Sequence, residues 1–269
     1  MNNQYPPPEN QSDVPPPEFE QDSNIVGNVR PERIAIKLPE TNSIVTYSIM
    51  GITIAVYALQ MISQTVIGDD LPALYGMKIN ELIAAGQVWR LFTPMLLHGS
   101  IMHIGFNMYA LYLFGRRLER YMGHGRFLIL YLISGFAGNV ISMMFTASPS
   151  LGASTAIFGL LGAQGIFIYQ NRALFGNQTR QALQSIIMVA AINLLIGLSP
   201  GIDNWGHIGG LVAGVIFTWL GGPVLAPSGT YPYARLEDQR TTSDVLLAIA
   251  VTGGFFALLA IGALFLMGS

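Results

Sequence analysis

The sequence predicts an all-α integral membrane protein that crosses the bilayer several times. Hydrophobic residues make up 51% of its 269 residues and charged residues only 10%, whereas a soluble domain carries about a quarter charged residues. Long apolar runs recur along the chain, and a helix of roughly 20 apolar residues crosses the hydrocarbon core. Because unpaired backbone groups are costly in lipid, each such run is expected to be helical.

The predicted elements follow in order along the chain. Residues 1–43 hold two Pro triplets and few apolar side chains, so they are predicted to form a disordered cytoplasmic tail. The first apolar run is too late and too long for a signal peptide, and we expect it to remain in the mature protein. Within 44–225 the predicted spans are 44–67, 96–115, 127–145, 154–169, 183–198 and 206–225, with an interfacial outer loop at 68–95; a cytoplasmic linker at 226–244 leads to a seventh span in 245–269.

The basic residues predict the orientation. Eleven of the thirteen Lys and Arg residues fall on one side of this span pattern, and only Lys78 and Arg90 fall on the other. Short cytoplasmic loops retain basic residues. We therefore expect a cytoplasmic amino terminus, an extracytoplasmic carboxyl terminus and a location in the bacterial inner membrane.

Charge and composition also limit the function. A net charge of −2 leaves no basic surplus for phosphates, so no nucleic-acid partner is expected. The absence of cysteine excludes disulfides and Cys-based metal sites. We expect neither a metal nor an organic cofactor, and the expected partners are the lipid bilayer and other membrane proteins.

Ser154 is the most informative polar residue at membrane depth. Its predicted span, 154–169, is about 24 Å long at 1.5 Å per residue, shorter than a hydrocarbon core of about 30 Å, so the span is expected to begin below the outer surface. A helix amino terminus offers unpaired N–H groups and a positive dipole, which suit a nucleophile beside an oxyanion site. A serine at this place can also simply cap the helix.

His207 opens another predicted span at the same depth. A serine hydroxyl needs a base to become a nucleophile, and His207 is the candidate. Phe158, one turn below Ser154, either supports the imidazole or packs in the core. Small residues permit the two spans to approach closely; they are Gly152, Ala156, Gly159 and Ala163 on one side and Gly206, Gly210 and Gly214 on the other.

Two residues of span 96–115 point to an oxyanion site. His103 and Asn107 are four residues apart and share one helix face, from which both can donate hydrogen bonds toward Ser154. The alternative is a polar clamp between helices. His98, placed in the same span, is expected to be structural or to gate water, and Asn193 is expected to bond between helices.

Four motifs together resemble the rhomboid intramembrane proteases across residues 44–225. They are Trp89-Arg90, His98-Gly-Ser-Ile-Met-His103-Ile-Gly-Phe-Asn107, Gly152-Ala-Ser154 and His207-Ile-Gly-Gly210-Leu-Val-Ala-Gly214. The resemblance implies a six-helix core plus one carboxyl-terminal helix. It also implies a Ser154/His207 dyad, an oxyanion hole of His103, Asn107 and the Ser154 backbone, and a structural role for Trp89 and Arg90. Thr155 and Phe158 stand where the family commonly has Gly and often Tyr.

The resemblance implies an endopeptidase that cleaves the transmembrane helices of substrate proteins near the outer leaflet. Two alternatives stay open. One is a non-catalytic relative that binds membrane helices without cutting them. The other is a small transporter, although this chain lacks the repeated halves and midplane charges typical of transporters.

Overall fold

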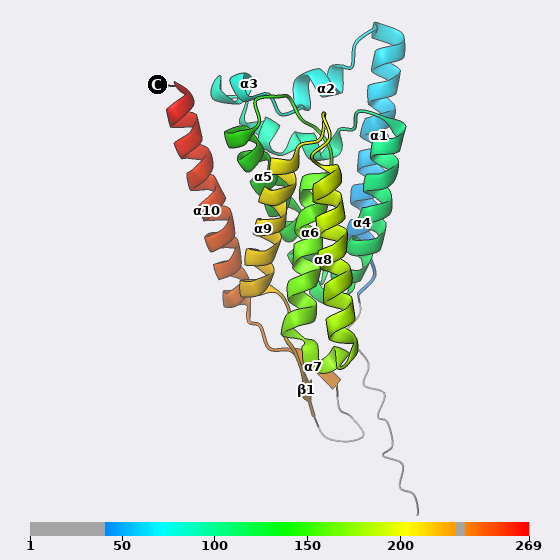
Figure 1. Cartoon of the computed structure of the whole chain (residues 1–269), viewed down its shortest axis with the longest axis vertical. Coiled ribbons are helices and arrows are strands. Elements are labelled where there is room, and N and C mark those ends of the chain that lie inside the picture. The colour runs from blue at the N-terminus through cyan, green and yellow to red at the C-terminus, as the bar shows by residue number, and fades with distance from the viewer. Residues whose placement is uncertain (1–40, 230–234, 269) are drawn as a thin grey trace, which may run out of the picture. The chain divides into compact units, whose positions relative to one another are not determined.

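The computed structural model describes residues 41–229 and 235–268, which belong to one compact unit (Figure 1). Most of the predicted tail therefore lies outside the described residues. Within them, the long helices are α1 (Ile44–Ile67), α4 (Ile101–Met122), α5 (His124–Phe145), α6 (Ser154–Gln170), α8 (Gln178–Ile196), α9 (Asn204–Gly221) and α10 (Thr242–Gly268). The prediction of an all-α fold is confirmed.

Short elements fill the connections. The outer loop holds α2 (Leu71–Gly76), α3 (Asn80–Ala84) and two 3-10 turns, η1 (Val88–Leu91) and η2 (Thr93–Leu96); α7 (Arg172–Phe175) joins α6 to α8. The predicted linker contains an antiparallel ribbon of β1 (Leu225–Ser228) and β2 (Arg235–Asp238), in which Leu225 pairs with Asp238 and Ser228 with Arg235. This ribbon was not predicted; an ion pair of 2.7 Å between Asp238 and Arg126 ties it to α5.

Four of the described helices are long and apolar enough to cross a membrane on their own: α1, α5, α8 and α10. In contrast, α6 has only 17 residues, and the last turns of α4 carry several charged side chains. The number of spans and their orientation therefore stay predictions. Figure 1 shows the carboxyl end of α10 at the same end as α2 and α3, with α7 and the ribbon at the opposite end.

One predicted boundary was wrong. The second long helix begins at Ile101 rather than at 96, because η2 occupies residues 93–96 and the Ser100 side chain caps α4 by accepting the His103 N–H at 3.1 Å. His98 consequently precedes the helix instead of lying within it. Asn193 was also misjudged: its amide donates to Val189 O of its own helix at 2.8 Å and is exposed.

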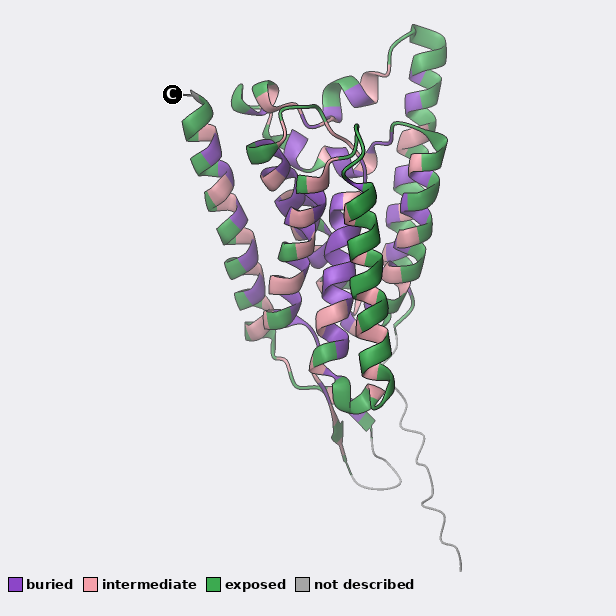
Figure 2. Ribbon diagram, in the orientation of Figure 1, coloured by how far each residue is buried: buried purple, intermediate pink, exposed green. Residues whose placement is uncertain are grey.

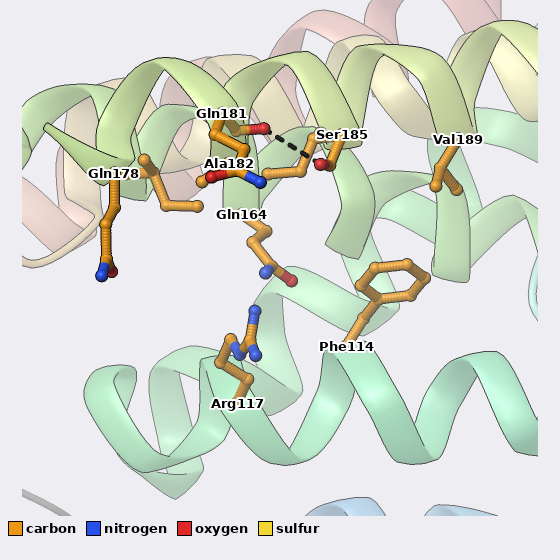
Figure 3. Close-up of a pocket in the computed structure, with 10 residues that line it drawn as sticks. Phe114, Arg117, Gln164, Gln178, Gln181, Ala182, Ser185 and Val189 are labelled. Atoms are coloured by element: carbon orange, nitrogen blue, oxygen red, sulfur yellow. Dashed lines mark hydrogen bonds between the residues drawn. The ribbon is translucent and has the colours of Figure 1, made fainter. Parts of the chain in front are cut away.

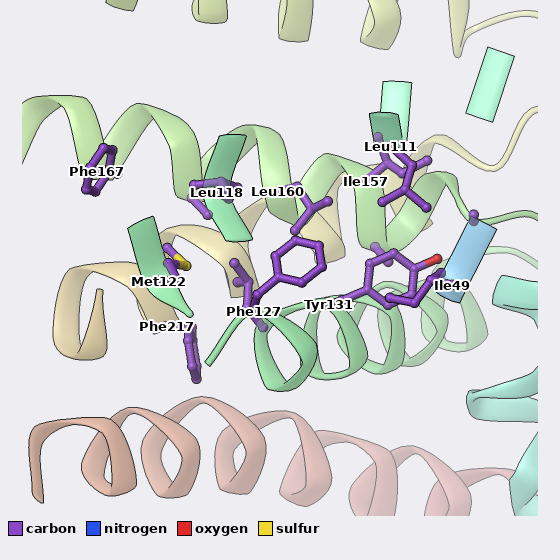
Figure 4. Packing of buried hydrophobic residues seen from close by; sticks show 14 of the residues in the cluster. Ile49, Leu111, Leu118, Met122, Phe127, Tyr131, Ile157, Leu160, Phe167 and Phe217 are labelled. Carbon is purple, nitrogen blue, oxygen red and sulfur yellow. The ribbon is translucent and has the colours of Figure 1, made fainter. Parts of the chain in front are cut away.

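The core is centred on α6, which packs against α4, α5, α8 and α9. Figure 2 shows α6 buried along most of its length, whereas α8 is largely exposed and has no buried residue. Figure 4 shows the side chains that fill the core between these helices. Phe127 and Tyr131 of α5 meet Leu160 of α6 there, and Leu118 of α4 and Phe217 of α9 belong to the same cluster.

Helices α6 and α9 meet backbone to backbone. A Cβ atom added to Gly210 would lie 1.9 Å from the carbonyl oxygen of Thr155, and one added to Gly214 would lie 2.0 Å from that of Gly159. No side chain fits at either place. This close approach brings together the amino-terminal turns of the two helices, which carry Ser154 and His207.

A buried carboxylate fixes α1 to the other end of α4. Glu119 accepts hydrogen bonds from the backbone N–H groups of Val45 and Thr46, both at 2.8 Å, and from the Thr46 hydroxyl at 2.6 Å. Oε1 of Glu119 also lies 2.6 Å from Nδ1 of His124. An anion at a helix amino terminus is favourable because the N–H groups there are unpaired and the dipole is positive.

Candidate active site

Ser154 and His207 are brought together at the amino-terminal ends of α6 and α9. The hydroxyl of Ser154 lies 2.9 Å from Nε2 of His207, within hydrogen-bond distance. The imidazole stacks on the ring of Phe158, with centroids 4.2 Å apart and an interplanar angle of 7°. Nδ1 of His207 is buried and has no partner among the described residues.

Ser154 does not cap its helix. The N-cap position is Ala153, and no side chain in the described ranges forms a capping bond there. The hydroxyl of Ser154 instead faces the imidazole, which leaves the first N–H groups of α6 without a side-chain partner. The site thus combines a hydroxyl, a base and free backbone donors.

Gly152 brings the loop before α6 close to His103. Its φ is 135°, a conformation that L side chains rarely adopt, and a Cβ atom there would lie 2.8 Å from Nε2 of His103 and 3.6 Å from the hydroxyl of Ser154. The N–H of Gly152 donates to Pro94 O at 2.9 Å. The imidazole of His103 therefore lies beside the loop that carries Ser154.

His98 is almost fully buried behind this loop. Its Nε2 accepts the N–H of Ala153 at 3.4 Å, and its ring lies 4.9 Å from that of His103. Its backbone N–H donates to Oε1 of Gln60 on α1 at 3.0 Å. The contacts of His98 thus join α1 to the residue before Ser154, and sequence reasoning gave Gln60 no part in this arrangement.

Asn107 is buried one turn below His103. Its amide nitrogen donates one hydrogen to the carbonyl of His103 at 3.0 Å. No hydrogen bond joins Asn107 to Ser154 among the described residues. An amide nitrogen carries two hydrogens, so Asn107 retains a second donor.

The side chain of Thr155 is directed toward α5 and α9. Its side chain is buried against Gly138 of α5 and Gly206 of α9: a Cβ atom at Gly138 would lie 2.6 Å from that of Thr155, and one at Gly206 would lie 3.0 Å from its methyl group. The bulk beside the serine is therefore accommodated by two glycines on neighbouring helices.

Asp203 was missed as a functional candidate. One carboxylate oxygen accepts the N–H of Gly206 at 3.0 Å, which caps α9 one turn before His207, and the other accepts the hydroxyl of Ser142 on α5. The sequence did carry a signal, since an Asp three residues before a helical Gly fits the N-cap pattern. The partner of Asp203 on α5, Ser142, is distant in the chain, so no local sequence pattern predicts this contact.

Lys78 joins the outer loop to the same region. Its backbone pairs with that of Ser150, in the loop before α6, through bonds of 2.9 and 3.1 Å. Its ammonium group donates to Thr146 O at 2.7 Å. Burial lowers the pKa of Lys78 to about 8, although attraction to Asp203 and Glu81 partly raises it.

Trp89 and Arg90 lie in η1 of the outer loop, and their hydrogen bonds stay within that loop. The Arg90 guanidinium is buried and donates to the carbonyls of Met77 at 2.7 Å and Leu74 at 2.8 Å. The indole of Trp89 donates to Tyr75 O at 3.1 Å. Both side chains hold the carboxyl end of α2. In the described part of the chain, no three His, Cys, Asp or Glu side chains gather in a way that suits a metal ion.

Comparison with known proteins matches residues 85–224 to the Rhomboid domain. Rhomboid protease GluP of Bacillus subtilis (strain 168) is 40% identical over 211 residues, which cover 78% of this chain and 39% of that protein. RHOMBOID-like protein 9, chloroplastic, of Arabidopsis thaliana is 37% identical over 58% of this chain and 36% of its own length. RHOMBOID-like protein 6, mitochondrial, of the same plant is 41% identical over 54% and 48%. The chain thus spans less than half the length of each of these relatives.

Proposed function

This chain belongs to the rhomboid family, and on that premise we propose that it is an intramembrane serine endopeptidase. Its substrates are other membrane proteins, whose transmembrane helices it cleaves near the outer leaflet. The observation that carries the proposal is the distance of 2.9 Å between the hydroxyl of Ser154 and Nε2 of His207. The relative named a rhomboid protease supports the same activity.

In the proposed reaction Ser154 is the nucleophile and His207 is the base and then the acid. The hydroxyl oxygen attacks the scissile carbonyl carbon while its proton passes to Nε2 of His207. The tetrahedral intermediate collapses, the C–N bond breaks and the imidazolium returns the proton to the leaving amine. A water molecule then attacks the acyl carbon and loses a proton to His207; the second tetrahedral intermediate collapses, the ester C–O bond breaks, and the imidazolium protonates the departing Ser154 oxygen to restore the hydroxyl.

The proposal assigns the oxyanion hole to the Ser154 N–H, His103 and Asn107. The Ser154 N–H lies in the first turn of α6, where backbone donors have no helical partner. The His103 ring lies beside Gly152, and Asn107 retains its second amide hydrogen. Stacking on Phe158 fixes the plane of the His207 imidazole, so the dyad is organised before substrate binds.

The proposal is tested with a serine-directed fluorophosphonate probe and a type I membrane reporter in proteoliposomes. Wild type is expected to react with the probe and to cleave the reporter, whereas Ser154→Ala should do neither. Ser48→Ala, which changes an exposed serine of α1, is the matched control. Cleavage by Ser154→Ala at the wild-type rate would overturn the mechanism. A wild type that folds but neither reacts nor cleaves would point to the non-catalytic relative.

A further inference from the structure

A cavity opens between α4, α6 and α8, in the half of the bundle remote from Ser154. It has a volume of about 390 Å³ (Figure 3). Gln164 contributes to its wall and follows Ser154 by ten positions on α6, about 15 Å along the axis at 1.5 Å per residue. The cavity therefore lies apart from the dyad, and neither His207 nor His103 contributes to its wall.

One end of this cavity is polar and carries a positive charge. Figure 3 shows the side chains of Arg117 and Gln164 pointing toward one another across it. Gln164 is only 4% exposed, and its Oε1 has no hydrogen-bond partner among the described residues. A buried polar atom without a partner is costly, so a ligand that donates a hydrogen bond to Oε1 would remove that cost. None of the lining residues is acidic.

The first turn of α8 adds to the positive potential. Gln178 and Gln181 of this turn line the cavity. The helix begins without a side-chain capping bond and without an acidic residue in its first turn. The N–H of Thr179 is bonded to Gly176 O at 3.2 Å, but the other first-turn N–H groups and the helix dipole favour an anion at the same end of the cavity as Arg117.

The opposite wall is apolar and is formed in part by the exposed helix α8. Ile186 and Val189 of α8 line the cavity together with Phe114 of α4. No residue of α8 is buried in the bundle, so an acyl chain can reach these side chains directly from the bilayer. The ligand that fits is thus an amphiphile with an anionic head that also carries hydrogen-bond donors.

We propose that this cavity binds an anionic glycerophospholipid in the leaflet opposite to Ser154. The phosphate pairs with Arg117, a hydroxyl of the head group donates to Oε1 of Gln164, and the acyl chain follows Ile186 and Val189. An arginine binds phosphate through two parallel N–H groups, which gives the contact direction as well as strength. This binding site does not depend on the proposed protease activity.

The test is native mass spectrometry of the purified full chain in detergent. The probes are dioleoyl phosphatidylglycerol, dioleoyl phosphatidylcholine and soluble glycerol phosphate. Wild type is expected to retain one phosphatidylglycerol in preference to phosphatidylcholine. Arg117→Gln should weaken retention about tenfold, as expected for loss of a charged hydrogen bond, and Gln164→Leu should reduce the preference for a hydroxylated head group. Arg180→Gln, a charge loss on α8 outside the cavity lining, should leave retention unchanged.

Several outcomes would overturn the proposal. Equal retention by Arg117→Gln and wild type would show that the cavity is not the site, and an equal loss in Arg180→Gln would indicate a general surface charge effect. Binding of glycerol phosphate as strong as that of the lipid would assign the cavity to a soluble ligand. Unchanged lipid retention with a raised KM for the membrane reporter would assign it to the substrate helix. Melting followed by tryptophan fluorescence confirms that each variant is folded.

Discussion

Gly210→Ala should separate the two helices that carry the dyad. The added Cβ atom would lie 1.9 Å from the carbonyl oxygen of Thr155, whereas ordinary contact begins at 3.4 Å, so α6 and α9 must move apart by about 1.5 Å (3.4 − 1.9). Overpacking of a core typically lowers the free energy of unfolding by about 1–3 kcal/mol. Because a backbone carbonyl cannot rotate away as a side chain can, we expect a loss near the upper end of this range. If half of the movement reaches the dyad, the 2.9 Å distance between Ser154 and His207 exceeds 3.6 Å and the hydrogen bond is lost.

The assay compares reporter cleavage and melting temperature in Gly210→Ala and Gly262→Ala. The control makes the same change on α10, where, apart from the adjacent residues and backbone of α10 itself, no atom of the described residues lies within 4 Å of the added Cβ. General-base catalysis contributes about 10²–10⁴ in rate, so Gly210→Ala should cleave at least about 100-fold more slowly and melt earlier. Gly262→Ala should behave like wild type. If the two variants retain equal activity and melt together, backbone contact does not position the dyad.

Three further variants test the surroundings of the site. Asp203→Ala removes the cap of α9 and should cost about 1 kcal/mol of unfolding free energy and slow probe labelling, because His207 lies on the next turn; labelling at the wild-type rate would contradict this. Burial lowers the pKa of Lys78 from 10.5 to about 8. Below pH 8 the folded state holds a buried ammonium, which lowers the free energy of unfolding. This loss of stability disappears as the pH rises from 8 to 10.5, because the folded state releases the proton first. The melting temperature of wild type should therefore rise relative to that of Lys78→Met over this range, and parallel curves would refute the assignment. Thr155→Val replaces a buried hydroxyl, for which the described part of the chain offers no hydrogen-bond partner, with a methyl group and should raise the melting temperature without slowing cleavage; a lower melting temperature would show that the hydroxyl is bonded.

The sequence predicted the helices well where an apolar run has sharp ends. The first span was placed at the bounds that α1 has, Ile44–Ile67. The start of α4 was misplaced because residues 96 and 97 continue the apolar pattern, while Pro94 and the cap at Ser100 shift the helix. The ribbon of β1 and β2 was not predicted, because a strand of four residues is too short to show a clear alternation of apolar and polar side chains.

The candidate site was predictable only in part. Motif residues at helix ends pointed to Ser154 and His207, and their proximity follows from small residues that can be counted in the sequence. The contacts of Asp203 with Ser142 and of Gln60 with His98 join residues far apart in the chain, so no local pattern reports them. The roles of His103 and Asn107 stay predictions, since the observed bond of Asn107 is to the His103 carbonyl.

The exposure of α8 makes its position sensitive to the surrounding lipid. Ala182, Leu183 and Ile186 pack against the core, but no residue of this helix is fully buried, so the match between its apolar length and the bilayer thickness also affects its position. A mismatch is relieved by tilting, at a cost of fractions of a kcal/mol per Å. We therefore expect α8 to change its tilt between thin and thick membranes while α5, α6 and α9 keep their arrangement, so that lateral pressure and acyl-chain length act on this chain much as a solvent acts on a soluble protein.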